Sequence, residues 1–119
     1  MIEIASRSNR LPPPPTIVWG SLTEPHQPGA RPWLRLLDDE VEPELVEAEH
    51  PVRVVWTSLW PARPRDQVHL DLADGGGMDT RVRFRLLTPD EPPDEITARG
   101  LRRRLSELLF ADLRYSYGQ

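Results

Sequence analysis

Residues 67–88 read QVHLDLADGGGMDTRVRFRLLT, and this stretch decides the fold. Apolar and polar side chains alternate on both sides of a glycine-rich centre at residues 74–77. A period of two is typical of a strand with one buried face and one solvent-exposed face. The glycines suit the positive backbone angles of a hairpin turn. The stretch therefore predicts an antiparallel hairpin whose inward residues are Val68, Leu70, Leu72, Thr80, Val82, Phe84 and Leu86.

The C-terminal residues carry the pattern that would cover the buried face of this hairpin. Arg99 and the three arginines at 102–104 lie largely on one side of a predicted helix. The acidic and proline-rich residues before it favour a helix start, but Gly100 costs about 1 kcal/mol relative to alanine. We therefore expect the continuous helix to begin near Leu101. Five leucines recur at helical spacing on its other side: Leu101, Leu105, Leu108, Leu109 and Leu113.

The N-terminal quarter is less regular. Residues 2–8 alternate as a short first strand, and the prolines at 12–15 end it because proline cannot donate a backbone hydrogen bond. Pro15 suits the first turn of a short helix that ends at residues 23–25. Residues 26–32 read as a loop punctuated by prolines. Residues 33–37 fit either a helical turn or a strand.

Two further strands are predicted in the middle of the chain. Residues 41–49 contain four glutamates and follow directly on Glu40, which indicates an edge strand with a solvated face. The neighbouring acidic residues from Asp38 onwards lack the spacing and the glycine of a calcium loop, so we interpret the whole cluster as solvated surface. Residues 52–59 have apolar side chains on both faces, which is typical of a central strand.

Composition limits the class of protein. A chain of 119 residues is expected to form one domain, residues 1–119, with one core. The net charge of -4 disfavours nucleic-acid binding, and the absence of cysteine excludes disulfides and thiolate metal sites. Neither a signal peptide nor a membrane-spanning stretch is apparent, so we expect a cytoplasmic protein.

Several segments together resemble a known superfamily. They are PTIVWGSLT at residues 15–23, Trp33, DTRVRF at residues 79–84 and the terminal leucine helix. The chain resembles the START-related helix-grip proteins (SRPBCC), which include polyketide cyclases and dehydratases, lipid-transfer domains, the birch-pollen allergen group and chaperone-ATPase activators. The chain departs from them at residues 33–49, which are compressed and acidic, so one strand of the family is expected to be missing.

The resemblance implies a fold and a cavity. The expected fold is α+β, with a curved antiparallel sheet of about five or six strands gripping a long C-terminal helix and short helices after strand one. A small or open cavity is expected between the sheet and the helix. Three tryptophans are the most prominent wall residues, although the same side chains serve equally well as core. The predicted ligand-binding residues are Trp19, Trp33, Val54, Trp56, Leu70, Phe84, Leu105 and Leu109.

Three function classes follow. The first is non-catalytic binding of a small hydrophobic or amphipathic molecule, without metal or cofactor, since His26, His50 and His69 are scattered and no catalytic group stands out. The second is a cyclase or dehydratase, which would need His26 or Tyr115 as acid or base inside the cavity. The third is a protein-interaction module with a filled interior, which would use Trp60 and the arginine face of the last helix to contact a protein partner or a second copy.

Overall fold

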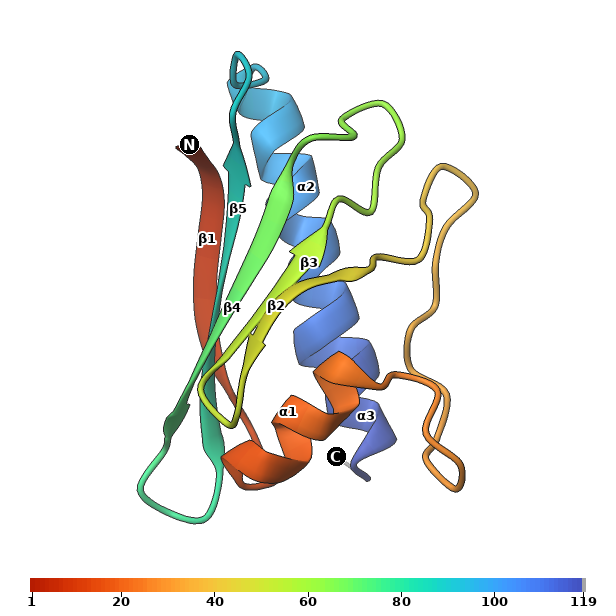
Figure 1. Cartoon of the computed structure of the whole chain (residues 1–119), viewed down its shortest axis with the longest axis vertical. Coiled ribbons are helices and arrows are strands. Elements are labelled where there is room, and N and C mark those ends of the chain that lie inside the picture. Colours follow the sequence, from red (N-terminus) through yellow and green to blue (C-terminus); the bar gives the residue numbers. More distant parts are fainter. Residues whose placement is uncertain (119) are drawn as a thin grey trace.

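The computed structural model of the chain describes residues 1–118, and it confirms the α+β fold class. Five strands form one antiparallel sheet in the order β1-β5-β4-β3-β2, and this sheet curves around a C-terminal helix (Figure 1). One helix, rather than several, follows the first strand. The strands and this helix are β1 (Ile2–Leu11), α1 (Pro15–Thr23), β2 (Leu45–Glu49), β3 (Arg53–Thr57), β4 (Gln67–Asp74) and β5 (Thr80–Thr88).

The C-terminal helix is continuous from Glu95 to Ser116, through α2 (Glu95–Glu107), a π-helical segment η1 (Leu108–Leu113) and α3 (Arg114–Ser116). The prediction that it begins near Leu101 is wrong. The Asp94 carboxylate accepts a hydrogen bond of 2.7 Å from the backbone N–H of Thr97, and this cap stabilises the first turn. The cap offsets the local cost of Gly100, which is solvent-exposed and packs against nothing.

The concave face of the sheet is filled by the side chains that the sequence places there. Val68, Leu70, Val82 and Phe84 are fully buried, as are Leu105, Leu109 and Leu113 of the helix, and all belong to one core cluster. Arg81 and Arg83, which alternate with them, are exposed. The matched periods of hairpin and helix therefore meet face to face, as predicted.

The glycine-rich turn between β4 and β5 has a steric reason. Gly76 has a φ of 92°, a backbone conformation that residues other than glycine rarely adopt. Gly75 lies against the Asp79 carboxylate, so a Cβ at this position would collide with it. The turn thus requires glycine at position 76, whereas a side chain at position 75 would have to displace the Asp79 carboxylate.

The middle of the chain differs in detail from the expectation. Residues 33–37 form neither helix nor strand, and the first acidic strand starts at Leu45 rather than at Val41. All five residues of β2 are exposed, as expected of an edge strand. In β3 the three central residues, Val54, Val55 and Trp56, are buried on both faces of the sheet.

Glu40 corrects the interpretation of the acidic cluster as solvated surface. Its carboxylate is almost fully buried and forms two hydrogen bonds with the Arg104 guanidinium, at 2.8 and 2.9 Å. Burial alone would raise the pKa of Glu40, but hydrogen bonds from Arg104 and from the Leu37 N–H, with the charge of Arg104, lower it below its ordinary value. This ion pair fastens the irregular segment 33–44 to α2.

In the part of the chain that the structure describes, no helix has the length and apolar character that crossing a membrane requires.

The buried leucine stripe gives a first prediction. Replacing Leu105 by alanine should lower the free energy of unfolding by about 2–5 kcal/mol, because Leu105 is fully buried and the cavity left behind adds to the lost burial. Ile96→Ala on the same helix is the matched control, since Ile96 is 78% exposed. Its effect should stay within about 0.5 kcal/mol in urea unfolding. Equal losses for the two variants would contradict the packing described.

The Glu40–Arg104 pair gives a second prediction. At pH 7, Glu40→Gln should lower the free energy of unfolding by about 2–3 kcal/mol, because it leaves the largely buried Arg104 with a weaker partner. The pKa of Glu40 is depressed in the folded state, so its contribution is complete above the unfolded value of 4.5 and is lost as the pH falls through the lower folded value.

Urea unfolding of both proteins between pH 7 and pH 3 measures this effect. The stability difference between wild type and Glu40→Gln should shrink below pH 4.5. Glu44→Gln, at an exposed position of the same segment, should show a small difference at every pH. A difference at Glu40 that stays constant down to pH 3 would contradict the assignment.

Candidate functional site

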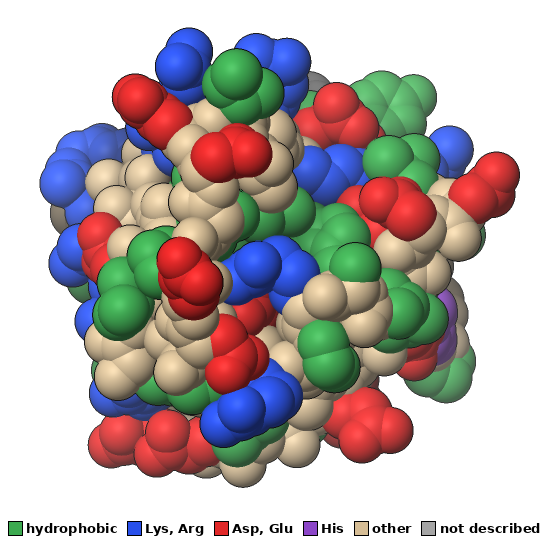
Figure 2. All heavy atoms as spheres, turned by 90° about the horizontal axis from the view of Figure 1, so that it is seen from above, with side chains coloured by type: hydrophobic (Ala, Val, Ile, Leu, Met, Phe, Trp, Pro, Cys, Tyr) green, Lys and Arg blue, Asp and Glu red, His purple; other side chains and the backbone are tan. Residues whose placement is uncertain are grey.

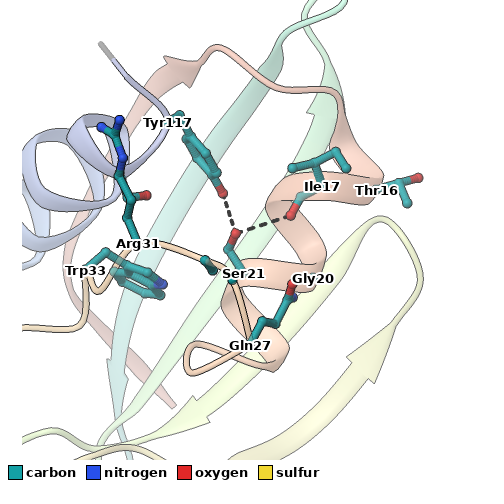
Figure 3. A pocket seen from close by; sticks show the side chains of 11 residues that line it. Thr16, Ile17, Gly20, Ser21, Gln27, Arg31, Trp33 and Tyr117 are labelled. Carbon is teal, nitrogen blue, oxygen red and sulfur yellow. Dashed lines mark hydrogen bonds between the residues drawn. The ribbon is translucent and has the colours of Figure 1, made fainter.

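A cleft of about 420 Å³ lies where α1, the loop after it and the C-terminal end of the chain meet (Figure 3). Its residues come from three segments that are far apart in the sequence. Two short runs of α1 form one wall, the segment from Gln27 to Trp33 forms another, and the end of the last helix closes it. The lining residues are Thr16, Ile17, Gly20, Ser21, Gln27, Gly29, Ala30, Arg31, Trp33, Ser116 and Tyr117.

Helix α1 is held in place by its buried side. Val18 and Leu22 insert into the core. Two indole N–H groups bridge the helix to β3: Trp56 donates to the carbonyl of Leu22 at 3.0 Å, and Trp19 donates to the carbonyl of Arg53 at 3.2 Å. The side of α1 that carries Gly20 and Ser21 is thereby turned toward the cleft.

Two hydroxyl groups join the walls. The Tyr117 hydroxyl donates to Ser21 Oγ at 2.6 Å, and Ser21 donates to the carbonyl of Ile17 at 3.3 Å (Figure 3). Burial raises the pKa of the Tyr117 phenol, although the bond to Ser21 partly opposes this. Tyr117 therefore stays protonated near neutral pH and is unsuited to act as a base.

Trp33 forms the inner wall of the cleft. It is 2% exposed, and its ring stacks on that of Trp56 with centroids 6.3 Å apart. Its Nε1 is buried and has no hydrogen-bond partner among the described residues. Such a group is rare in folded proteins, because a buried donor without an acceptor has lost its bond to water without replacement.

The structure brings the eight predicted ligand-binding residues together, but Trp33 alone among them lines this cleft. Trp19 packs at the border of the core and is partly buried. The other predicted residues are at most 2% exposed and fill the space between sheet and helix; they are Val54, Trp56, Leu70, Phe84, Leu105 and Leu109.

Sequence reasoning missed the other residues of the cleft. Ser21 lies within the segment PTIVWGSLT, whose periodicity indicates a helix but not which polar residue meets a partner. Tyr117 lies 96 positions further on, so no local pattern could pair the two hydroxyls. Arg31 stands before a proline in a loop, where an arginine carries no specific signal.

The structure corrects the roles that the alternative hypotheses assigned to three residues. Trp60, expected to be an exposed contact, is only 6% exposed and belongs to the core cluster. Tyr115, proposed as an acid or base inside a cavity, is 67% exposed. Arg104 leaves the expected arginine face of the helix, because its side chain turns to the buried Glu40.

Charged side chains of both signs are mixed at the end of the molecule where α2 begins. Arg99, Arg102 and Arg103 are exposed on α2. Viewed from the end at which α2 begins, arginine and acidic side chains alternate with small apolar areas (Figure 2). On this face the apolar areas are separated by charged side chains, whereas a docking face would be expected to have an extended apolar surface.

The histidines lie apart from the cleft. His26 is largely exposed and pairs with Glu42, a partner that the sequence did not indicate. His69 lies on the outer face of β4, where burial and the nearby charges of Arg53 and Arg85 lower its pKa. Residues 1–118 contain no group of three or more side chains of the types that hold a metal ion.

Comparison with solved structures places this geometry among known folds. CalU16 from Micromonospora echinospora shares 18% identity over 88% of this chain and 70% of its own, with a TM-score of 0.62. The Aha1 dimer protein from Colwellia psychrerythraea shares 12% identity over 93% of this chain and 92% of its own, with a TM-score of 0.64. Ara h 8.0201 shares 12% identity over 97% of both chains, with a TM-score of 0.55.

The chain has the helix-grip fold. Neither a family model nor a curated protein sequence matches it. At these identities the likeness concerns the fold alone, and the function has to be argued from the cleft itself.

Proposed function

We propose that the chain is a non-catalytic binding protein for a small apolar or amphipathic molecule, which enters at the cleft between α1 and the C-terminal end. The observation that carries the proposal is Trp33, a core tryptophan that also forms the cleft wall and keeps an unpaired N–H. The cleft volume of about 420 Å³ falls within the range of about 300–1,000 Å³ typical of small-molecule sites.

The lining suits a ligand with an apolar body. Ile17 and Ala30 offer apolar surface, the Trp33 ring lies almost fully buried in the wall, and Ser21 and Tyr117 supply hydroxyls at one edge. The other predicted wall residues lie behind Trp33 in the core. We propose that they contact a ligand only where it separates the helix from the sheet, so that Trp33 is the first of them to be reached.

The cleft favours binding over catalysis. General acid–base catalysis needs a group whose pKa lies near the working pH. Tyr117 is held protonated by burial, and Ser21 already accepts from Tyr117 and donates to a backbone carbonyl. Neither histidine nor carboxylate stands among the described residues that line the cleft. The cyclase or dehydratase alternative has no observation of this kind in its favour.

A third prediction tests binding. In a thermal-shift screen of lipids, aromatic compounds and polyketide-like compounds, a ligand present at a hundred times its Kd should stabilise the folded state by about 2.7 kcal/mol. The same ligand should change tryptophan fluorescence, because Trp33 lies in the wall. Ala30→Phe should abolish both effects, because Ala30 lines the cleft and a larger side chain there would occupy it.

Ala62→Phe is the matched control, since Ala62 is exposed in another loop and does not line the cleft. It should leave the shift in melting temperature unchanged. A ligand that stabilises both variants equally binds elsewhere, and a screen without any shift would contradict the proposed function.

A further inference from the structure

We propose that the molecule bound in this cleft is a carboxylate, whose oxygens accept from the Arg31 guanidinium and from the indole N–H of Trp33. This inference rests on the proposed function and names the chemical class of the ligand.

The charge of the lining favours an anion. The chain contains 19 acidic residues against 15 arginines, yet the described lining of the cleft contains no aspartate and no glutamate. Arg31 supplies the single full charge of this described lining, and within residues 1–118 Arg31 forms no ion pair. A guanidinium binds a carboxylate well because its donors match the two oxygens in geometry.

The indole N–H of Trp33 is the second observation. Two of the other tryptophans have acceptors: Trp19 and Trp56 donate to backbone carbonyls at 3.2 and 3.0 Å. Trp33 is as deeply buried as Trp56, yet its Nε1 lacks an acceptor among the described residues. Figure 3 shows this nitrogen on the side of the ring that faces Ser21 and α1. A ligand oxygen would satisfy it.

Two hydroxyl groups of the cleft already donate their protons within the protein. The Tyr117 hydroxyl donates its proton to Ser21 Oγ, and the Ser21 hydroxyl donates its proton to the carbonyl of Ile17. Arg31 and the Trp33 N–H are donors only, while the Gln27 amide, which also lines the cleft, can donate or accept. They flank Pro32 in the chain, and the exposed Arg31 side chain has to turn from its direction in Figure 3 for one ligand group to meet both. A ligand that satisfies these two donors must present acceptors, and a carboxylate presents only acceptors.

Residues 28–31, which precede Trp33 in the chain, could give a ligand access to its N–H by moving. The N–H is sealed from solvent in this structure, so binding requires residues 28–31 to shift. Two long backbone hydrogen bonds hold this segment, from Gln27 to Glu24 at 3.3 Å and from Ala30 to Gln27 at 3.2 Å. A Cβ added to Gly29 would meet no atom within 4 Å, so the segment is loosely packed there.

The experiment compares 1-naphthylacetate with 2-(1-naphthyl)ethanol, which share a ring system and differ in charge. Titration calorimetry of the full chain should give a Kd up to about fivefold lower for the carboxylate, since an exposed ion pair contributes at most about 1 kcal/mol. In ¹H–¹⁵N spectra the carboxylate should shift the Trp33 indole cross-peak downfield and leave that of Trp56 in place, because Trp56 already has its acceptor.

Two variants separate the charge from the fold. Arg31→Gln should remove the preference for the carboxylate and retain binding of the alcohol. Arg35→Gln is the control, because Arg35 is exposed on the same segment and does not line the cleft; it should retain the preference.

Equal affinity for both probes would overturn the carboxylate assignment and leave the proposed function standing. If neither probe binds, both the carboxylate assignment and the proposed function are overturned for ligands of this size. A preference that survives in Arg31→Gln, or a shift of another indole in place of Trp33, would overturn the roles assigned to these two residues.

Discussion

The packing of one leucine-lined helix into a concave sheet is the interaction on which the rest of the structure depends. The helix presents Leu105, Leu109 and Leu113 at helical spacing, and the hairpin presents its alternate residues at a spacing of two. Neither pattern buries its apolar face alone. Once they meet, the remaining strands add at the edges, and α1 is fixed against β3 by two tryptophan hydrogen bonds.

The long irregular segment between α1 and β2 depends on a different force. Few of its backbone groups pair with each other, so its position is set by the buried Trp33 and by the ion pair between the buried Glu40 and Arg104 of α2. Arg104 also donates to the carbonyl of Arg35 at 2.5 Å, and the Arg35 N–H donates to the carbonyl of Trp33 at 2.8 Å. The cleft wall that carries Trp33 is therefore linked to the last helix through one charged side chain.

Local periodicity explains what the sequence could and could not predict. The hairpin and the leucine helix repeat their patterns several times, so both the elements and their buried faces could be inferred. Glu40 could not be distinguished from the acidic residues around it, because its burial depends on Arg104, 64 positions away. Trp60 stands just before Pro61 at the start of a loop and was expected to be exposed, yet tertiary packing buries it. The cleft joins three distant segments, so only Trp33, which also serves the core, was found beforehand.

The pairing of β1 with β5 has a consequence for the order of events during synthesis. Ile2 lies opposite Thr88, so β1 finds its hydrogen-bonding neighbour only after the chain has been extended as far as Thr88. At about 5–20 residues per second, the strand waits for several seconds on the ribosome. Arg7, Ser8, Asn9 and Arg10 are exposed in the finished fold. During that wait the same polar and charged residues discourage premature pairing with other nascent chains.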